Sequence, residues 1–227
     1  MLPELIVALD VETIEKAEAV INTLCPEVKF FKVGPVLFTA YGPRAVDLIR
    51  SKGAGVFLDL KYHDIPNTVA LAVRQAARLK VEMLTLHISG GEEMLRACVS
   101  AGQEEARALK IKKPLLLGIT VLTSDNSGKN TLDIVLDRAR LAKSAGLDGV
   151  VCSVAEAAAV RKACGKDFII VTPGIRPSAS KTDDQKRIAT PEEAKKAGAD
   201  FIVVGRPVLE AANPLKAAEE IIKGLSA

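Results

Sequence analysis

The sequence predicts an α/β protein, a single-domain (β/α)8 barrel of the TIM type, and three observations predict it. Short runs rich in Val, Ile, Leu and Phe alternate with longer segments of helical pattern. Most of these runs lack a polar/apolar alternation, as is typical of parallel strands covered on both faces. Eight such runs fit into 227 residues, a common length for one barrel. No linker divides the chain, so we expect one domain over residues 1–227.

The strands are expected where the apolar runs lie. They are Leu5–Asp10, Phe30–Gly34, Gly55–Lys61, Met83–Ile88, Leu115–Leu122, Gly149–Ser153, Phe168–Thr172 and Phe201–Gly205. The helices are expected in the segments between them, which are rich in Ala, Glu, Lys and Arg. They are Val11–Leu24, Pro43–Ser51, Thr68–Leu79, Glu92–Leu109, Thr131–Ala145, Val154–Ala163, Pro191–Ala197 and Pro207–Ile222. Gly53, Gly146 and Gly198 each follow one of these helices, where a left-handed C-terminal cap is favoured.

Polar and charged residues collect at the C-terminal ends of these strands. Asp10, Lys32 and Asp59 are examples, whereas the opposite ends are mostly turns such as the one before Gly55. The active site of a barrel of this class forms at the C-terminal ends of its strands. The sequence therefore predicts a polar site at that end.

The segment from Asp59 to Asp64 carries the strongest signal for chemistry. Side chains alternate along a strand, so Asp59 and Lys61 are expected on one face. With Lys32 at the end of the neighbouring strand, two ammonium groups would surround one carboxylate and attract an anionic substrate, and Asp64 could restore the balance of charge. A structural ion pair at a strand end is the alternative interpretation.

A second signal follows the last strand. Gly205 lets a backbone N–H approach an anion closely, Arg206 offers a bidentate fork, and Pro207 suits the start of a helix. This pattern is typical of a phosphate site, although a turn glycine with a solvated arginine would also fit it. Arg176 is a weaker hint. The long irregular stretch 177–190 follows the seventh strand and is a candidate lid over the barrel mouth.

Composition argues against several classes of protein. The chain has 31 Lys and Arg against 28 Asp and Glu, only 4% aromatic residues and no Trp, so a nucleic-acid partner is not expected. No apolar run approaches the ~20 residues that cross a bilayer, and no signal peptide is expected. The four cysteines form no CxxC pair and predict reduced thiols in a cytoplasmic protein. No His, Asp or Glu cluster has the spacing of a metal site.

In these residues and the motifs around them, the chain resembles the orotidine 5′-phosphate decarboxylase family. The motifs that carry the resemblance run nearly end to end in order: Ala8-Leu9-Asp10, Phe31-Lys32-Val33-Gly34, Asp59-Leu60-Lys61-Tyr62-His63-Asp64-Ile65-Pro66-Asn67-Thr68, Val121-Leu122-Thr123-Ser124, Pro173-Gly174-Ile175-Arg176-Pro177, Asp184-Gln185 and Val204-Gly205-Arg206-Pro207. The resemblance implies a carboxy-lyase that converts orotidine 5′-monophosphate to uridine 5′-monophosphate in pyrimidine biosynthesis, without a metal or an organic cofactor. It also implies a homodimer, with Asp64, Ile65 and Thr68 supplied across the interface.

The resemblance also implies a role for each residue of the site. Lys61 would protonate the C6 carbanion within an array of Lys32, Asp59, Lys61 and Asp64. The expected substrate-binding residues are Asp10 and Lys32 for the ribose, Thr123 for the pyrimidine, Gln185, Gly205 and Arg206 for the phosphate with Arg176 alongside, and Ile65 and Thr68 from the partner.

Two alternatives remain open. Sugar-phosphate decarboxylases and aldolases of the same suprafamily share the D-x-K-x-x-D pattern but use Mg²⁺, which a Glu on the second strand helps to hold. Lys32 stands at that position here and would repel the ion. A non-catalytic nucleotide-binding barrel is the other alternative, although a binder has no need of a lysine at C6.

Overall fold

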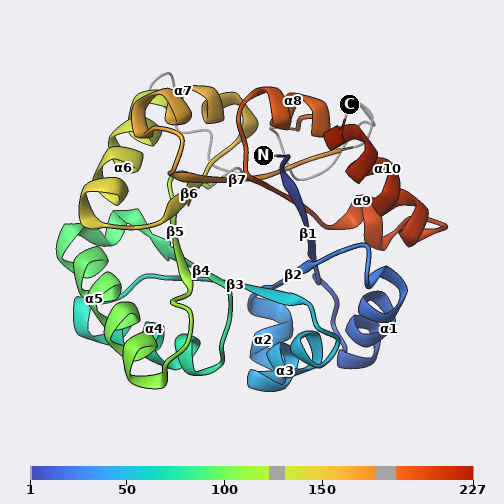
Figure 1. The fold of residues 1–227 in the computed structure, drawn as a ribbon, viewed down its shortest axis with the longest axis horizontal. Helices are drawn as coiled ribbons and strands as arrows, with labels where there is room; N and C mark the ends of the chain where they lie inside the picture. The colour runs from blue at the N-terminus through green and yellow to red at the C-terminus, as the bar shows by residue number, and fades with distance from the viewer. Residues whose placement is uncertain (1, 123–130, 177–187, 227) are drawn as a thin grey trace.

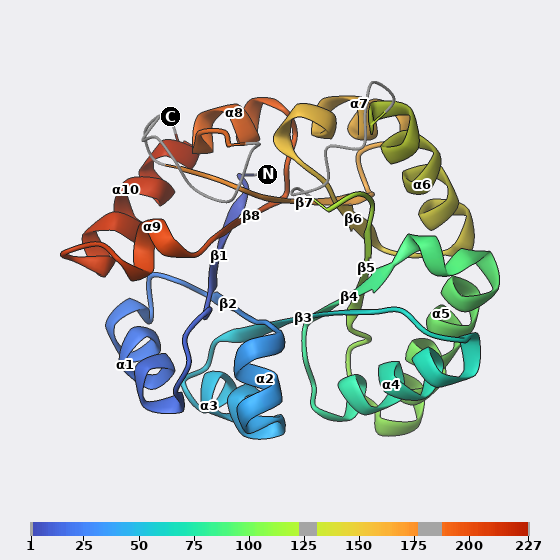
Figure 2. The same cartoon turned by 180° about the vertical axis from the view of Figure 1, so that it is seen from behind.

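The computed structural model describes residues 2–122, 131–176 and 188–226, and it is a closed barrel of eight parallel strands. Each strand pairs with the next along the chain (Figure 1), and β8 pairs with β1 (Figure 2). The strands are β1 (Glu4–Ala8), β2 (Phe30–Val33), β3 (Gly55–Tyr62), β4 (Met83–His87), β5 (Leu115–Ile119), β6 (Gly149–Val151), β7 (Ile169–Pro173) and β8 (Phe201–Val204). The predicted (β/α)8 barrel is thereby confirmed.

The helices form an outer ring around the strands in both views (Figures 1 and 2). They are α1 (Ile14–Leu24), α2 (Pro35–Tyr41), α3 (Pro43–Ser51), α4 (Pro66–Arg78), η1 (Ile88–Gly90), α5 (Gly91–Leu109), α6 (Thr131–Ala145), α7 (Val154–Cys164), α8 (Pro191–Lys196), α9 (Arg206–Leu209) and α10 (Pro214–Ser226). Within the described ranges, none of these helices has the length and apolar character to cross a membrane.

Two helical predictions were incomplete. Helix α2 was missed because its seven residues are too few to show a helical period, although Pro35 at its first position is a start signal. The predicted helix Pro207–Ile222 was wrong as one element, since α9 ends at Leu209 and α10 begins at Pro214. Proline lacks the N–H that a continuous helix needs, and the Asn213 side chain accepts a hydrogen bond from the Lys216 N–H and so begins a new helix.

The glycines that follow three helices have the conformation expected of them. The φ angles of Gly53, Gly146 and Gly198 are 76°, 90° and 84°, in the left-handed region that side chains with a Cβ rarely adopt. These residues end their helices and turn the chain back toward the next strand.

The apolar core has two layers. A small inner cluster fills the barrel below its mouth and consists of Ile6, Ala8, Phe57, Met83, Leu117, Val171 and Val203. A larger cluster lies between the strands and the helices. Because side chains alternate along a strand, inward residues recur at every second position, and the next inward positions above Phe57 and Met83 are Asp59 and Thr85. Both are buried, so polar groups replace apolar ones toward the C-terminal end of the barrel.

The opposite end of the barrel is tied together by acidic side chains that precede even-numbered strands. Carboxylate oxygens of Glu82, Asp148 and Asp200 accept hydrogen bonds from the backbone N–H of the second residue of β3, β5 and β7, at 2.5, 2.8 and 2.7 Å. The backbone carbonyls of these three residues accept from the first residues of β5, β7 and β1. The acidic residue that precedes each of these even-numbered strands thus makes hydrogen bonds to both neighbouring strands.

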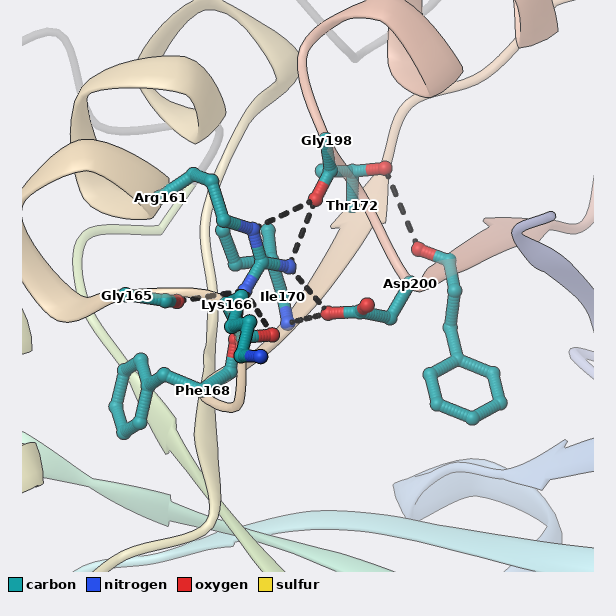
Figure 3. Close-up of polar contacts among 9 residues, drawn as sticks. Arg161, Gly165, Lys166, Phe168, Ile170, Thr172, Gly198 and Asp200 are labelled. Carbon is teal, nitrogen blue, oxygen red and sulfur yellow. Dashed lines mark hydrogen bonds and ion pairs between the residues drawn. The ribbon is translucent and has the colours of Figure 1, made fainter. Parts of the chain in front are cut away.

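Arg161 on α7 binds Asp200, the acidic residue that precedes β8 (Figure 3). Its guanidinium donates to Asp200 Oδ2 at 2.6 Å and to the Gly198 carbonyl at 2.8 Å. A further nitrogen of the same group donates to the carbonyl oxygens of Gly165, Lys166 and Phe168. This one side chain therefore satisfies the carbonyls that follow α7 and holds the carboxylate that caps β7.

We expect Arg161→Met to lower the free energy of unfolding by about 3 kcal/mol, because it removes the cation that pairs with a partly buried carboxylate and leaves several carbonyls without their guanidinium donor. Urea denaturation would measure the change. Arg140→Met is the matched control, since Arg140 is exposed and pairs with the exposed Asp137 at 3.0 Å. Its loss should cost about 0.5 kcal/mol or less. Equal effects of the two substitutions would contradict the role of Arg161.

Candidate active site

A cavity of about 250 Å³ opens at the C-terminal ends of the strands. One part of its wall is charged and includes Lys32, Asp59 and Lys61. Another part is apolar, with side chains from β5, β6 and the segment after β5. They are Ile119, Val121, Leu122 and Val151. A cavity lined by both charged and apolar side chains suits a small ligand that has an anionic part and an apolar part.

Three of the four residues of the predicted charge array meet in this cavity. The Lys61 Nζ lies 2.8 Å from Asp59 Oδ2, and the Lys32 Nζ lies 3.4 Å from the same oxygen. The Lys32 Nζ also lies 3.1 Å from Asp10 Oδ1. The array thus runs from Asp10 through Lys32 and Asp59 to Lys61, with carboxylates and ammonium groups in alternation.

Lys32 and Asp59 are the buried members of the array, and each stabilises the charged form of the other. Burial opposes the ionisation of Asp59, but attraction to Lys32 and Lys61 and hydrogen bonds from Lys61 and Thr85 outweigh it, so the pKa of Asp59 lies below its ordinary value. Burial also opposes the charge on Lys32, but attraction to Asp59 and Asp10 outweighs this effect and raises the pKa of Lys32. Both groups are therefore charged at neutral pH.

The end of β3 is irregular where it carries the array. Leu58 pairs with Leu84 of β4, but the next pair is Tyr62 with Leu86, so three residues of β3 lie opposite one residue of β4. Lys61 has a φ of 50°, which is uncommon for a residue with a Cβ. The sequence predicted that Asp59 and Lys61 would share a face through regular alternation. They do meet, but through a bulge that redirects Lys61.

Sequence reasoning missed three residues of this site. Thr85 is completely buried, donates to Asp59 Oδ1 at 3.0 Å and accepts from the Lys61 N–H at 2.9 Å. Gly34 leaves room for the array, because an added Cβ would lie 3.2 Å from the Lys32 Nζ. Cys152 lines the cavity, and burial raises the pKa of its thiol, which therefore stays protonated. Counting every second position from Met83 would have identified Thr85 as inward-facing.

The residues predicted to bind phosphate lie on the same rim. Gly205 and Arg206 follow β8, Arg176 follows β7, and all three line the cavity. A Cβ added to Gly205 would lie 3.6 Å from Asp10 Oδ2, so the ends of β8 and β1 approach closely here. Arg176 is buried, and one of its guanidinium nitrogens donates to the Ile175 carbonyl at 3.0 Å.

Asp64, Ile65 and Thr68 lie apart from the array in the single chain. All three are exposed, Ile65 to 67%, and none lines the cavity. The Asp64 carboxylate accepts a hydrogen bond from the Ile65 N–H at 2.7 Å. One chain therefore does not bring the fourth charge of the predicted array into its own cavity.

Two predicted binding residues, Thr123 and Gln185, lie outside the described residues, as does most of the candidate lid at 177–190. Residues 174–176, which precede this segment, and residues 188–190 at its C-terminal end are described, and they meet. Arg176 N–H donates to the Ala189 carbonyl at 2.9 Å, and Ala189 N–H donates to the Gly174 carbonyl at 3.2 Å. This backbone bridge holds Ala189 beside Gly174 and Arg176, two residues that line the cavity.

A parallel (β/α)8 barrel with a charged cavity at its strand ends is typical of an enzyme. The sequence matches the orotidine 5′-phosphate decarboxylase / HUMPS family over residues 3–221. The chain belongs to this family, and its class is that of a carbon–carbon lyase, as the sequence predicted.

Individual relatives agree with this assignment. An orotidine 5′-phosphate decarboxylase of Coxiella burnetii (strain RSA 493 / Nine Mile phase I) is 50% identical over 98% of this chain and 97% of its own length. One from Moorella thermoacetica is 46% identical, over 96% of this chain and 90% of its own length. The crystal structure of orotidine 5′-phosphate decarboxylase from Lactobacillus acidophilus is 36% identical, with a TM-score of 0.87 over 100% of both chains.

Proposed function

We propose that the protein converts orotidine 5′-monophosphate to uridine 5′-monophosphate and CO2, without a metal ion or an organic cofactor. The relatives named above carry this activity in their names. The observation that carries the proposal is the contact of Lys61 and Lys32 with one oxygen of Asp59 at the wall of the cavity, 2.8 and 3.4 Å away. This array offers both a cation and a proton where a carbanion forms.

The chemistry of the reaction explains the need for such an array. When the bond from C6 to the carboxylate carbon breaks, its electron pair stays on C6, where no ring carbonyl can delocalise it as an enolate. The Lys61 ammonium would stabilise this charge and then transfer a proton to C6, and solvent would later return a proton to the amine. Asp59 would hold Lys61 in place and lie near the carboxylate that leaves.

The remaining roles follow the geometry of the rim. Asp10 and Lys32, which pair at 3.1 Å, would bind the ribose hydroxyls. Gly205, Arg206 and Arg176 would hold the phosphate together with Gln185, and Thr123 would contact the pyrimidine edge. Phosphate binding far from C6 would supply the energy that closes the segment 177–190 over the substrate.

We further propose a homodimer in which Asp64, Ile65 and Thr68 reach the cavity of the partner. These residues are exposed in the single chain, and Ile65 is an apolar side chain in water. The array of the single chain ends at the Lys61 ammonium, which lies 2.8 Å from Asp59. A carboxylate supplied by the partner would continue the alternation of charges beyond Lys61.

The first alternative is a Mg²⁺-dependent sugar-phosphate decarboxylase or aldolase of the same suprafamily. Its metal would need an oxygen ligand at position 32, where the Lys32 ammonium contacts both Asp10 and Asp59 and repels a divalent cation. The second alternative, a non-catalytic nucleotide-binding barrel, does not explain an ammonium group set against a buried carboxylate.

The proposal predicts that purified protein converts orotidine 5′-monophosphate in excess EDTA. The fall in ultraviolet absorbance of the substrate and chromatography of the product would measure it. Turnover at an equal rate with and without EDTA would support a reaction independent of metal. If the substrate remains unchanged and a keto-sugar phosphate reacts only with Mg²⁺, the proposal is wrong and the first alternative is correct. Tight binding of uridine 5′-monophosphate without any turnover would favour the second alternative.

A further inference from the structure

We infer that Thr85 is a positioning residue of the active site, whose hydroxyl holds the Asp59 carboxylate and the backbone of Lys61 in their working arrangement. The inference rests on the proposed function. Thr85 does not line the cavity and so acts through the two residues that do.

The backbone of β3 explains why such a residue is needed. Three residues of β3 lie opposite Thr85 alone, so the Lys61 N–H has no carbonyl of the regular ladder to bond. An N–H that is shielded from water and has no partner destabilises the folded chain. The Thr85 hydroxyl oxygen accepts this N–H at 2.9 Å and takes the place of the missing carbonyl.

The same hydroxyl also fixes the carboxylate. Its proton is donated to Asp59 Oδ1 at 3.0 Å, while Asp59 Oδ2 faces the ammonium groups of Lys61 and Lys32. The two oxygens of Asp59 thus have separate partners, and the plane of the carboxylate is set. One hydroxyl that gives its proton to Asp59 and accepts one from Lys61 joins the two ends of the catalytic pair.

The conformation of Lys61 makes this support necessary. A φ of 50° is unfavourable for a residue with a Cβ, so Lys61 would relax toward an extended conformation without a restraint. Relaxation would carry the Lys61 side chain away from Asp59 and from the reacting carbon. A displacement of about 1 Å at a reacting group can cost about 100-fold in rate.

Thr85→Val tests the inference, since valine keeps the shape of threonine and removes the hydroxyl. We expect kcat for orotidine 5′-monophosphate to fall about 100-fold, because the array is displaced. KM should change about 3-fold or less, because the phosphate and ribose contacts remain and only transition-state stabilisation is lost. Thr85→Ser restores the hydroxyl and should recover kcat to within about 5-fold of the wild type, with some cost from the lost methyl group.

Thr172→Val is the matched control. Thr172 is also fully buried within a strand, and its hydroxyl donates to the Phe201 carbonyl at 3.4 Å (Figure 3). Its alternation with the inward-facing Val171 places it on the outer side of the barrel. This variant should keep the wild-type kcat, although it too loses a buried hydroxyl. Thermal unfolding of each variant would establish that the protein is folded during the assay.

The outcomes separate the inference from the proposed function. If the wild type does not decarboxylate the substrate, the proposed function fails. If the wild type is active and Thr85→Val keeps kcat within a few-fold of it, the inference alone is wrong. Equal losses in Thr85→Val and Thr85→Ser, or in Thr85→Val and Thr172→Val, would also overturn it. If Thr85→Val unfolds at the assay temperature, Thr85→Cys replaces it, because cysteine keeps a small side chain with only a weak donor.

Discussion

Replacing Lys61 with alanine is expected to abolish turnover and leave the barrel folded. Lys61 lies at the wall of the cavity with 31% of its side chain exposed, so its truncation leaves no large hole in the core. In the proposed mechanism, the substitution removes both the cation beside C6 and the proton that C6 receives. Since general acid catalysis alone contributes up to about 10⁴-fold, we expect kcat to fall by about that factor or more.

The measurement is the initial rate of orotidine 5′-monophosphate conversion, with circular dichroism as the check on folding. Lys80→Ala is the control, because Lys80 is another lysine with a positive φ, 57°, but is exposed just before β4, at the opposite end of the barrel. It should keep the wild-type rate. A Lys61→Ala protein that retains substantial activity would show that Lys61 is not the proton donor.

Mixing two inactive variants is expected to restore activity if the proposed dimer is correct. Asp64→Asn should remove the partner's charge from each site, and Lys61→Ala should remove the proton donor. In a mixed dimer, one cavity loses both groups and the other has Lys61 from one subunit and Asp64 from its partner. After subunit exchange at equal concentrations, random pairing in a two-fold dimer leaves about a quarter of all sites intact. We therefore expect about a quarter of the wild-type activity.

The control for this experiment is a chain that carries both substitutions. Mixed with Asp64→Asn, it forms no intact site, so activity should stay at the background. Native mass spectrometry would verify that mixed dimers form in each case. Mixed dimers without recovered activity would contradict the assignment of Asp64 to the partner's cavity. Full activity of Asp64→Asn by itself would remove Asp64 from the array.

Much of this architecture was predictable because its signals are local. The strands carry unbroken apolar runs, and the left-handed glycines follow helices in the expected places. Lys32 and Asp59 were correctly expected to meet, since the ends of neighbouring parallel strands lie at one edge. These signals depend on residue type and short spacing, which a single sequence contains.

The features that sequence reasoning missed depend on how the chain is packed. The bulge at Lys61 arises from a shift in pairing between β3 and β4. The residue types of β3 alone do not predict this shift. In the sequence, Thr85 has no feature that distinguishes it from other strand threonines. Only the fold places its hydroxyl between Asp59 and the Lys61 N–H. Pro214 is a signal for the start of a helix, but the apolar pattern after Pro207 continues past it and so predicted one helix instead of α9 and α10.

The carboxylates that precede β4, β6 and β8 have a consequence for the evolution of this barrel. They close the end opposite the cavity with hydrogen bonds that involve none of the groups around Lys61, so the two ends can accept mutations independently. The equivalent residue before β2 is Lys29, whose carbonyl still accepts from Gly55. The same position thus recurs every two strands around the ring, with one divergent copy. This periodicity makes the closed end a repeat of two-strand units, and it keeps the hydrogen bonds of that end separate from the residues around the cavity.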